Sequence, residues 1–190
     1  MKVVFLDRDG VINKYPGDFE YVKSWEGFQF LPNIKPALKR LCEGGFKIFI
    51  ISNQAGVSKG IFSQQSLNLI SENMLKELSK FEIKIDGIFY CIHKPEDNCS
   101  CRKPKTGLID KALTTFKLKN NKDQEDGYFI GDTIRDVETG KAAGLSTILV
   151  FSGKEKPENR NNWQTQPDFT AKDLSEAVDI ILKPPHQLRI

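Results

Sequence analysis

Short apolar segments alternate with amphipathic ones along most of this chain, and this alternation constrains the fold more than any other feature. Apolar runs typical of buried parallel strands occupy residues 2–6, 46–51, 87–90, 128–130 and 146–151. Apolar residues at helical spacing follow them in segments 34–42, 63–80, 107–116, 135–143 and 173–182. Alternation of this kind predicts an α/β fold, a three-layer sandwich with a mainly parallel sheet and right-handed crossovers.

The chain has 190 residues, which is long enough for one domain with a full hydrophobic core. No repeat or linker is visible, so we expect a single domain over residues 1–183, with a loop at 119–126 and a flexible tail at 184–190. The irregular stretch at 10–32 is long for a connection, and long connections often act as lids or binding loops. Nothing indicates a large inserted cap domain.

Charge and hydropathy argue against two classes of partner. The formal net charge is only +3 and the basic residues are scattered, so we expect no nucleic-acid binding. No apolar run approaches the roughly 20 residues that span a bilayer, so we expect no membrane partner. The N-terminal apolar stretch is short and ends in acids, unlike a signal peptide. We therefore expect a cytoplasmic protein, and a monomer.

Polar side chains follow the predicted strands where each strand ends. In chain order they are Asp7, Asp9, Ser52, Lys103 and Asp132. Because an open α/β sheet places its active site beyond the carboxyl ends of its strands, we expect these groups to share one site. Two carboxylates one residue apart suit a nucleophile and an acid/base that serve the same bond. Asp136, a helical turn after Asp132, fits either a group supporting the site or a surface acid.

The order of these groups forms a motif set: D-x-D-G at 7–10, then Ser52, then Lys103, then G-D-x-x-x-D at 131–136. The set resembles the haloacid dehalogenase-like superfamily of aspartate-nucleophile phosphatases, over residues 2–151. The resemblance implies a Rossmann-like fold, a Mg²⁺ ion and a covalent aspartyl-phosphate. Dehalogenases of this superfamily lack an acid at the position of Asp9, because a halide leaves without a proton. We therefore predict a hydrolase that cleaves phosphate esters.

The residue types suggest a role for each member of the set. Asp7 would attack phosphorus in line, and Mg²⁺ held by Asp7, the Asp9 carbonyl and Asp132 would cancel charge between two anions. Lys103 would add a fixed positive charge, and the Ser52 hydroxyl would donate to a phosphoryl oxygen. Asp9 would protonate the leaving alkoxide and later take a proton from water.

Three thiols and one imidazole fall within eleven positions, in the order Cys91, His93, Cys99 and Cys101. Their number and softness suit tetrahedral Zn²⁺, and four protein ligands leave no open position, so the zinc would be structural. Its task would be to staple the loop at 91–101 so that Arg102 and Lys103 project into the active site. Cys42 lies on the apolar face of a predicted helix and belongs to the core.

The pattern C-x-H…C-x-C-R-K-P resembles two zinc-bearing families without a cap, the D-glycero-D-manno-heptose 1,7-bisphosphate phosphatases and the histidinol-phosphate phosphatases. The resemblance implies that Arg102 recognises the substrate and that Lys103 contacts the phosphoryl group. The short spacing at 94–98 is similar to the histidinol-phosphate family, whereas segments 21–32 and 53–60 resemble the heptose family. We favour the heptose bisphosphate, losing its 7-phosphate, with histidinol phosphate as the alternative.

A heptose bisphosphate is a small phosphorylated metabolite on a route to nucleotide-activated heptose for lipopolysaccharide, and it carries a second phosphate. That phosphate needs cationic partners, for which Arg102, Lys59 and Lys105 are candidates, although the two lysines also fit solvent exposure. Asn53 and Gln54 are expected to bind the substrate as well.

Two further classes of function compete with this one. A zinc-stapled binding module without catalysis is disfavoured by the complete motif set. A nucleic-acid 3′-end phosphatase would share the chemistry, but the chain shows no basic stripe or stacking platform.

Overall fold

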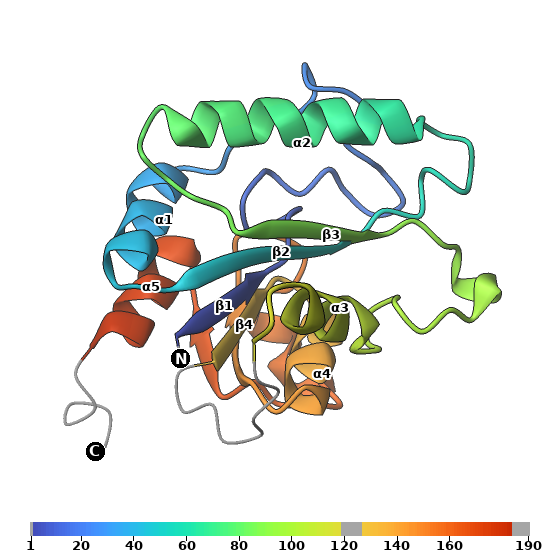
Figure 1. Cartoon of the computed structure of the whole chain (residues 1–190). Coiled ribbons are helices and arrows are strands. Elements are labelled where there is room, and N and C mark those ends of the chain that lie inside the picture. The colour runs from blue at the N-terminus through green and yellow to red at the C-terminus, as the bar shows by residue number, and fades with distance from the viewer. Residues whose placement is uncertain (1, 119–126, 184–190) are drawn as a thin grey trace.

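A computed structural model describes residues 2–118 and 127–183, and its centre is a six-stranded sheet (Figure 1). The strands are β1 (Val3–Leu6), β2 (Lys47–Asn53), β3 (Gly87–Cys91), β4 (Gly127–Gly131), β5 (Ser146–Val150) and β6 (Phe169–Ala171). Their spatial order is β3-β2-β1-β4-β5-β6, and every neighbouring pair is parallel. The predicted parallel α/β fold is thus confirmed.

Helices cover both faces of the sheet. They are α1 (Ile34–Glu43), α2 (Gln64–Ser79), α3 (Gly107–Thr115), α4 (Ile134–Ala142) and α5 (Leu174–Leu182). Figure 1 shows α1, α2 and α5 on one face and α3 and α4 on the other, which gives the expected three layers. Two helices begin at side chains that accept a backbone hydrogen bond, Ser63 before α2 and Asp173 before α5.

The central strands are buried on both faces, which explains why their sequences are apolar without alternation. In β1, Val4 and Leu6 pack into the core beneath α1, α2 and α5, whereas Val3 and Phe5 pack against α3 on the other face. Phe5 stacks on Phe49 of the neighbouring strand, with 5.5 Å between ring centroids. Each fully buried side chain of this kind contributes about 1.5–3 kcal/mol, so the inner strands are firmly held.

Several element boundaries differ from those expected. The strand β6 was not predicted, because a strand of only three residues at the sheet edge is too short to show a clear periodicity. The second strand extends through Ser52 and Asn53, which therefore lie within the sheet instead of following it. Short 3₁₀ turns at Pro95–Asp97 and Pro157–Asn162 were also not expected. The predicted loop at 119–126 and tail at 184–190 lie outside the described residues.

The connection from β1 to α1 contains an ordered loop, which we call the 10–32 segment. Its two arms pair: Lys14 N donates to Gln29 O at 2.8 Å, and Leu31 N donates to Ile12 O at 3.0 Å. Val22 and Phe28 anchor the segment in the core near α1 and α2. The segment is therefore a packed loop beside the first strand end. Within the described ranges, no connection contains an additional sheet or domain.

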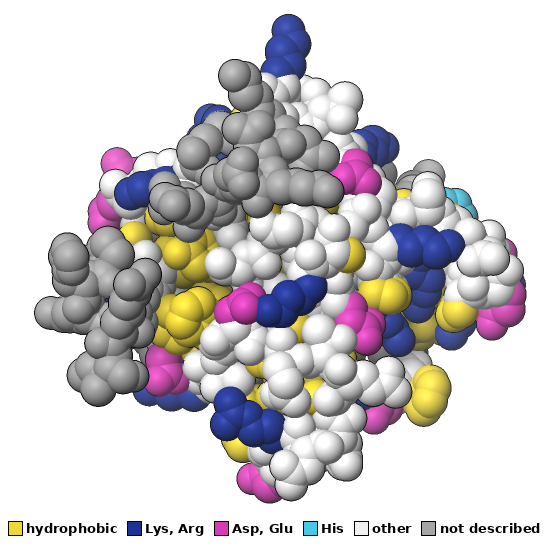
Figure 2. All heavy atoms as spheres, turned by 90° about the horizontal axis from the view of Figure 1, so that it is seen from below, with side chains coloured by type: hydrophobic (Ala, Val, Ile, Leu, Met, Phe, Trp, Pro, Cys, Tyr) yellow, Lys and Arg dark blue, Asp and Glu magenta, His cyan; other side chains and the backbone are white. Residues whose placement is uncertain are grey.

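The surface is mixed in charge. On the face shown in Figure 2, basic and acidic side chains are interspersed and form no continuous basic stripe. Among the described residues, no helix is both long and apolar enough to cross a bilayer.

Candidate active site

The side chain of Lys103 lies at the centre of the site, with both of its ionic partners beyond the strand ends. Its Nζ is 3.0 Å from Asp7 Oδ2 and 2.5 Å from Asp136 Oδ1, and the lysine side chain is almost fully buried. Burial alone disfavours the ammonium, but the carboxylates of Asp136 and Asp7 outweigh this effect and raise the pKa of Lys103. The site therefore contains a permanent, desolvated positive charge beside the predicted nucleophile.

Asp7 directly follows β1 and is the predicted nucleophile. Its backbone N donates to Ile130 O in β4 at 3.0 Å, which fixes the start of the loop. Burial raises the pKa of Asp7 to about 6; Lys103 opposes the shift, and the negative charges of Asp136 and Asp9 add to it. Burial and neighbouring negative charges disfavour the ionised form of Asp7, so a cation bound beside it would be stabilised.

Asp132 follows β4 and is held by the loop that follows β5. Its Oδ2 accepts a hydrogen bond from Lys154 N at 2.8 Å, and its O accepts one from Glu155 N at 3.0 Å. A Cβ at Gly153 would lie 2.0 Å from Asp132 Oδ2, so only glycine permits this approach. Burial raises the pKa of Asp132 well above its usual range, and Asp7 adds to the shift.

Asp9 points into a set of hydrogen-bond donors. Arg8 Nη2 donates to both of its oxygens at 3.0 Å, Asn13 Nδ2 donates to Oδ1 at 2.8 Å and Gln54 Nε2 donates to Oδ2 at 2.8 Å. Gln54 Nε2 also donates to Ser52 Oγ at 3.2 Å. This places Asp9 and Ser52, two predicted catalytic groups, in one hydrogen-bonded network.

Asn53, predicted to bind substrate, makes a reciprocal pair with the backbone of Lys103. Its Nδ2 donates to Lys103 O at 3.2 Å, and its Oδ1 accepts from Lys103 N at 3.1 Å. The amide thus ties the end of β2 to the segment that carries the central lysine. Its partner in the prediction, Gln54, is buried and engaged with Asp9 as described above.

The four predicted zinc ligands come together at the end of β3. Distances between neighbouring ligand atoms are 3.6 Å from Cys91 Sγ to Cys99 Sγ, 3.4 Å from Cys99 Sγ to Cys101 Sγ and 3.2 Å from Cys101 Sγ to His93 Nδ1. Tetrahedral Zn–S bonds of about 2.3 Å place two sulfurs about 3.7 Å apart. The spacing of the four side chains therefore fits one zinc ion.

Lys105 and Arg102 flank this loop in different ways. Lys105 Nζ donates to Asn98 O at 3.0 Å and to Cys99 O at 2.8 Å, so it braces the loop from within. Arg102 Nη1 donates to His93 O at 3.2 Å and lines a pocket of about 280 Å³ with Lys103 and Arg135. Lys105 lines the same pocket, but its ammonium is engaged by the backbone oxygens of Asn98 and Cys99, whereas the described structure gives the guanidinium of Arg102 a single hydrogen bond, to His93 O.

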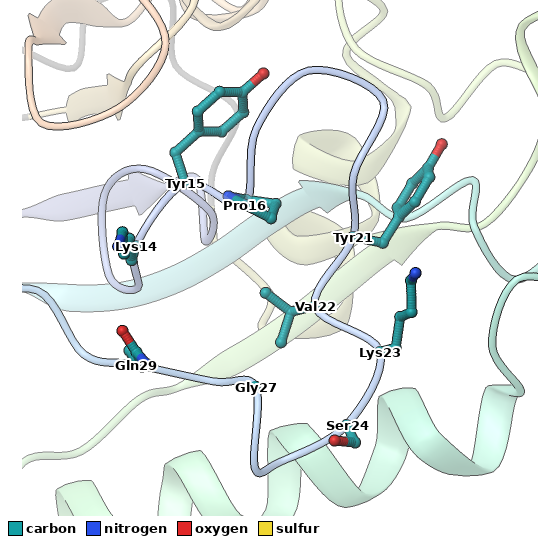
Figure 3. A pocket seen from close by; sticks show the side chains of 9 residues that line it. All are labelled: Lys14, Tyr15, Pro16, Tyr21, Val22, Lys23, Ser24, Gly27 and Gln29. Atoms are coloured by element: carbon teal, nitrogen blue, oxygen red, sulfur yellow. The ribbon is translucent and has the colours of Figure 1, made fainter.

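Lys59 lies beside the 10–32 segment. Its Nζ is 5.8 Å from the ring centroid of Tyr21, and the residue is exposed. Figure 3 shows a pocket of about 400 Å³ between the arms of the segment, with Lys14 and Tyr15 on one arm and Tyr21 and Lys23 on the other.

The same segment is linked to the Asp132 loop by an ionic contact. Lys154 Nζ is 2.6 Å from Asp18 Oδ1, and that oxygen also accepts from Tyr15 OH at 2.6 Å. The neighbouring Ser152 Oγ donates to Gly10 O at 2.7 Å. The 10–32 segment therefore reaches the site through the residues that hold Asp132.

Sequence reasoning missed several residues of the site. Arg8 and Asn13 were not singled out, although their place within three residues of the D-x-D-G motif and their ability to donate were visible signals. Asp136 was left open; the structure places it in the interior against Lys103. Nothing in the sequence pointed to Lys154, because its contact with Asp132 is made by the backbone N–H, which every residue except proline carries.

The carboxylate cluster fits a divalent cation. Ligand atoms of Asp7, Asp132 and Asp136 lie within 4.8 Å of one another, and two opposite oxygens bound to Mg²⁺ are about 4.2 Å apart. Three carboxylates face one lysine, so the group carries excess negative charge that a divalent ion would neutralise.

Comparison with known proteins agrees with this geometry. A family model described as HAD-hydrolase-like matches residues 100–177. D-glycero-beta-D-manno-heptose-1,7-bisphosphate 7-phosphatase from Haemophilus ducreyi is 37% identical over 161 residues, which cover 80% of this chain and 85% of the relative. D-glycero-alpha-D-manno-heptose-1,7-bisphosphate 7-phosphatase from Campylobacter jejuni is 36% identical over 155 residues, covering 82% and 85%.

A solved structure is similar over nearly the whole chain. The crystal structure of D,D-heptose 1,7-bisphosphate phosphatase from B. bronchiseptica, complexed with magnesium and phosphate, is 30% identical with a TM-score of 0.86. The match covers 96% of this chain and 98% of that one. At such identity and coverage, the chain belongs to the heptose-1,7-bisphosphate phosphatase family of the haloacid dehalogenase-like hydrolases.

Proposed function

We propose that this chain is a Mg²⁺-dependent phosphatase that removes the 7-phosphate of D-glycero-D-manno-heptose 1,7-bisphosphate. The observation that carries the proposal is the Asp7 carboxylate at the end of β1, 3.0 Å from a buried lysine and beside two further buried carboxylates. The names of the relatives support the substrate. Because one relative acts on the beta and another on the alpha anomer, they leave the anomer open.

The first half of the reaction transfers the phosphoryl group to the protein. Asp7 Oδ attacks phosphorus in line, the ester P–O bond breaks, and an aspartyl-phosphate forms. Lys103 stabilises the negative charge on the phosphoryl oxygens because its ammonium is fixed and desolvated before the substrate arrives. The Ser52 hydroxyl, buried next to Gln54, donates to a phosphoryl oxygen.

Protons are moved by Asp9. A sugar alkoxide is a poor leaving group, so Asp9 donates a proton to its oxygen as the P–O bond breaks. Asp9, then a carboxylate, accepts a proton from the water that attacks the aspartyl-phosphate. The second P–O bond breaks, inorganic phosphate leaves and the Asp7 carboxylate is restored.

Asp7 and Asp132, with the Asp9 carbonyl, are the proposed ligands of Mg²⁺, and Asp136 lies close enough to join them. The bound ion would neutralise the charge between nucleophile and phosphate. The magnesium in the B. bronchiseptica relative supports this assignment.

Zn²⁺ is the proposed structural ion of the loop at 91–101. Its four ligands leave no open position, and the chain continues directly into Arg102 and Lys103. Zinc would thus hold in place the segment that delivers the central lysine. We assign Arg102, at the pocket beside Lys103, to the second phosphate of the substrate.

Other expectations stay predictions. They are the single domain over 1–183, the monomeric state, the cytoplasmic location and substrate contacts from Asn53, Gln54 and Lys59.

Phosphate release from a substrate panel with Mg²⁺ tests the proposal. We expect kcat/KM for the heptose bisphosphate to exceed that for histidinol phosphate, which the short 94–98 spacing keeps as the alternative. Asp7→Asn should release no phosphate above background, whereas Asp179→Asn, an exposed carboxylate paired with Arg40, should match the parent. A preference for histidinol phosphate would overturn the substrate, and an active Asp7→Asn enzyme would overturn the nucleophile.

A further inference from the structure

We propose that Arg8 is a positioning residue for Asp9, and that Arg8, Asn13 and Gln54 form a socket that orients the acid/base carboxyl group. The inference rests on the proposed function and deepens it, because it assigns a task to three residues between the motif positions. No substrate contact is required of them. They act through Asp9.

The three residues supply every side-chain hydrogen bond that the described structure gives Asp9. Arg8 uses Nε, 3.3 Å from Oδ1, as well as Nη2, which is 3.0 Å from each oxygen. Asn13 binds Oδ1 and Gln54 binds Oδ2, both at 2.8 Å. Donors on both oxygens fix the plane of the carboxyl group as well as its position.

The socket is a buried structure. Arg8 and Asn13 are 0% exposed and Gln54 is 1% exposed, whereas the side chain of Asp9 is 19% exposed. The three donors are therefore buried around Asp9, and of these four side chains Asp9 is the most exposed. A buried guanidinium is costly unless it is paired, so the contact between Arg8 and Asp9 determines where the Asp9 side chain lies.

The amide groups are oriented for Asp9 at a cost. Asn13 Oδ1 and Gln54 Oε1 are buried and, among the described residues, have no hydrogen-bond partner. Turning either amide over would place an oxygen against the carboxylate, so the nitrogens must face Asp9. Unpaired buried oxygens are uncommon and disfavour folding, which is consistent with a site arranged for chemistry.

Arg8 is also held from its far side. Its Cζ lies 5.7 Å from the ring centroid of Tyr90, and Tyr90 OH is 3.0 Å from Ser71 Oγ on α2. The guanidinium is thus confined between β3, α2 and the loop after β1. Because Arg8 is confined by buried contacts, the orientation of Asp9 is set by packing in the core and does not depend on surface residues.

The chemistry explains why such a socket would matter. As Asp9 gives its proton to the leaving oxygen, it becomes a carboxylate, and its interaction with the Arg8 cation strengthens. An interaction that grows towards the transition state accelerates the step, whereas one of constant strength does not. The benefit depends on the leaving group: an alkoxide needs the proton, but p-nitrophenolate leaves readily without one.

The test compares kcat/KM for the heptose bisphosphate and for p-nitrophenyl phosphate in Arg8→Lys, Arg8→Met and Gln54→Met. Since kcat/KM reports the steps up to phosphoryl transfer, it isolates the role of the acid from dephosphorylation. We expect Arg8→Met to lose about 100-fold on the sugar phosphate, the lower range for a general acid, and less than about 10-fold on the aryl phosphate. Arg8→Lys should recover part of the loss, because lysine keeps the charge but not the two-pronged contact.

Two references make the result decisive. Asp9→Asn sets the size of the leaving-group effect when the acid itself is removed. Thr147→Val removes a buried hydroxyl hydrogen-bonded to Asp168, outside the site, and should lower both activities equally or not at all. Gln54→Met removes one donor to Asp9 but keeps the buried ion pair between Arg8 and Asp9. It therefore tests the socket even if Arg8→Met does not fold.

The outcomes separate this inference from the proposed function. If Asp9→Asn shows the leaving-group effect but the folded Arg8 and Gln54 variants lose both activities equally, the socket is only structural and the inference is overturned. If Asp9→Asn itself shows no such effect, or the parent releases no phosphate, the proposed function fails instead.

Discussion

The ammonium of Lys103 lies 2.5 Å from the carboxylate of Asp136, and both side chains are buried. Asp136 belongs to the first turn of α4, and its Oδ2 accepts hydrogen bonds from Thr133 N at 3.1 Å and Thr133 Oγ1 at 2.6 Å. The lysine belongs to the segment after β3. The side chain of Asn53 also holds that segment, through hydrogen bonds to the backbone N and O of Lys103. The central cation of the site is therefore positioned by two elements that are distant in sequence.

Replacing Asp136 by Asn should weaken both stability and catalysis. The change leaves a buried lysine with one anionic partner fewer, and breaking a buried pair costs about 3–5 kcal/mol. We expect a loss of that order in the free energy of unfolding, measured with denaturant, together with a lower kcat. Asp179→Asn breaks an exposed pair with Arg40 and should cost less than about 1 kcal/mol. Equal effects of the two changes would contradict the structural role of Asp136.

Replacing Gly153 by Ala should displace Asp132. The new Cβ would lie 2.0 Å from Asp132 Oδ2, so the carboxylate has to move from the cluster. We expect apparent Mg²⁺ affinity, measured from the metal dependence of activity, to fall about 10–100-fold. At Gly27 the nearest atom to a new Cβ would be Ser24 O at 3.6 Å, so Gly27→Ala should leave the Mg²⁺ dependence unchanged. An unaffected Gly153→Ala enzyme would show that Asp132 is no ligand.

Stability of the metal-free protein should depend on pH through Asp7. Burial raises the pKa of Asp7 from 3.8 to about 6, so the folded protein binds this proton more tightly than the unfolded chain. The resulting stabilisation is complete below about pH 4 and is lost as the pH rises through 6. Relative to the parent, Asp7→Asn should therefore gain on the order of 2 kcal/mol between pH 4 and 7. Denaturant unfolding in a chelator across this range measures the difference; a constant difference would refute the shift.

Removal of zinc should loosen the loop at 91–101. Structural zinc contributes directly to folding, so Cys99→Ser should contain less zinc by elemental analysis and unfold at a lower temperature. Its activity should also fall at saturating Mg²⁺, because the loop leads into Lys103. Cys42 is outside the cluster, with its Sγ 3.6 Å from Lys84 O, so Cys42→Ser should keep its zinc. Full activity in a zinc-free Cys99→Ser protein would contradict the proposed task of the ion.

Truncation of Lys154 should distinguish the role of its side chain from the role of its backbone N–H. Lys154→Ala removes the contact with Asp18 but retains the N–H that binds Asp132. Because the ion pair is exposed, stability should change by less than about 1 kcal/mol. We expect KM to rise with kcat nearly unchanged in steady-state kinetics, since the 10–32 segment loses one attachment to the site. Lys23→Ala, which breaks a contact with Glu20, provides the control. A fall in kcat with KM unchanged would contradict the assignment of the Lys154 side chain to the 10–32 segment.

Much of the site was predictable because its signals are local. Strand ends can be located from short apolar runs, and the spacing of cysteine and histidine specifies a ligand set without knowledge of the fold. Lys105 shows where such reasoning stops: an isolated lysine is compatible with solvent or with phosphate, and the structure engages it with Asn98 and Cys99 instead. The three-residue strand β6 was missed for a similar reason, since pairing with β5 defines it more than its own composition.

The sequence by itself determined the parallel α/β architecture, the identity of the carboxylate motif and the four-ligand loop, because periodicity and spacing are properties of neighbouring residues. Only the tertiary structure decided that Lys103 pairs with Asp136, that Arg8 is buried behind Asp9 and that Gly153 must yield space to Asp132. Those contacts join segments far apart in the chain or depend on which side chain is buried. The energies that select them arise from desolvation and packing, which exist only once the layers have assembled.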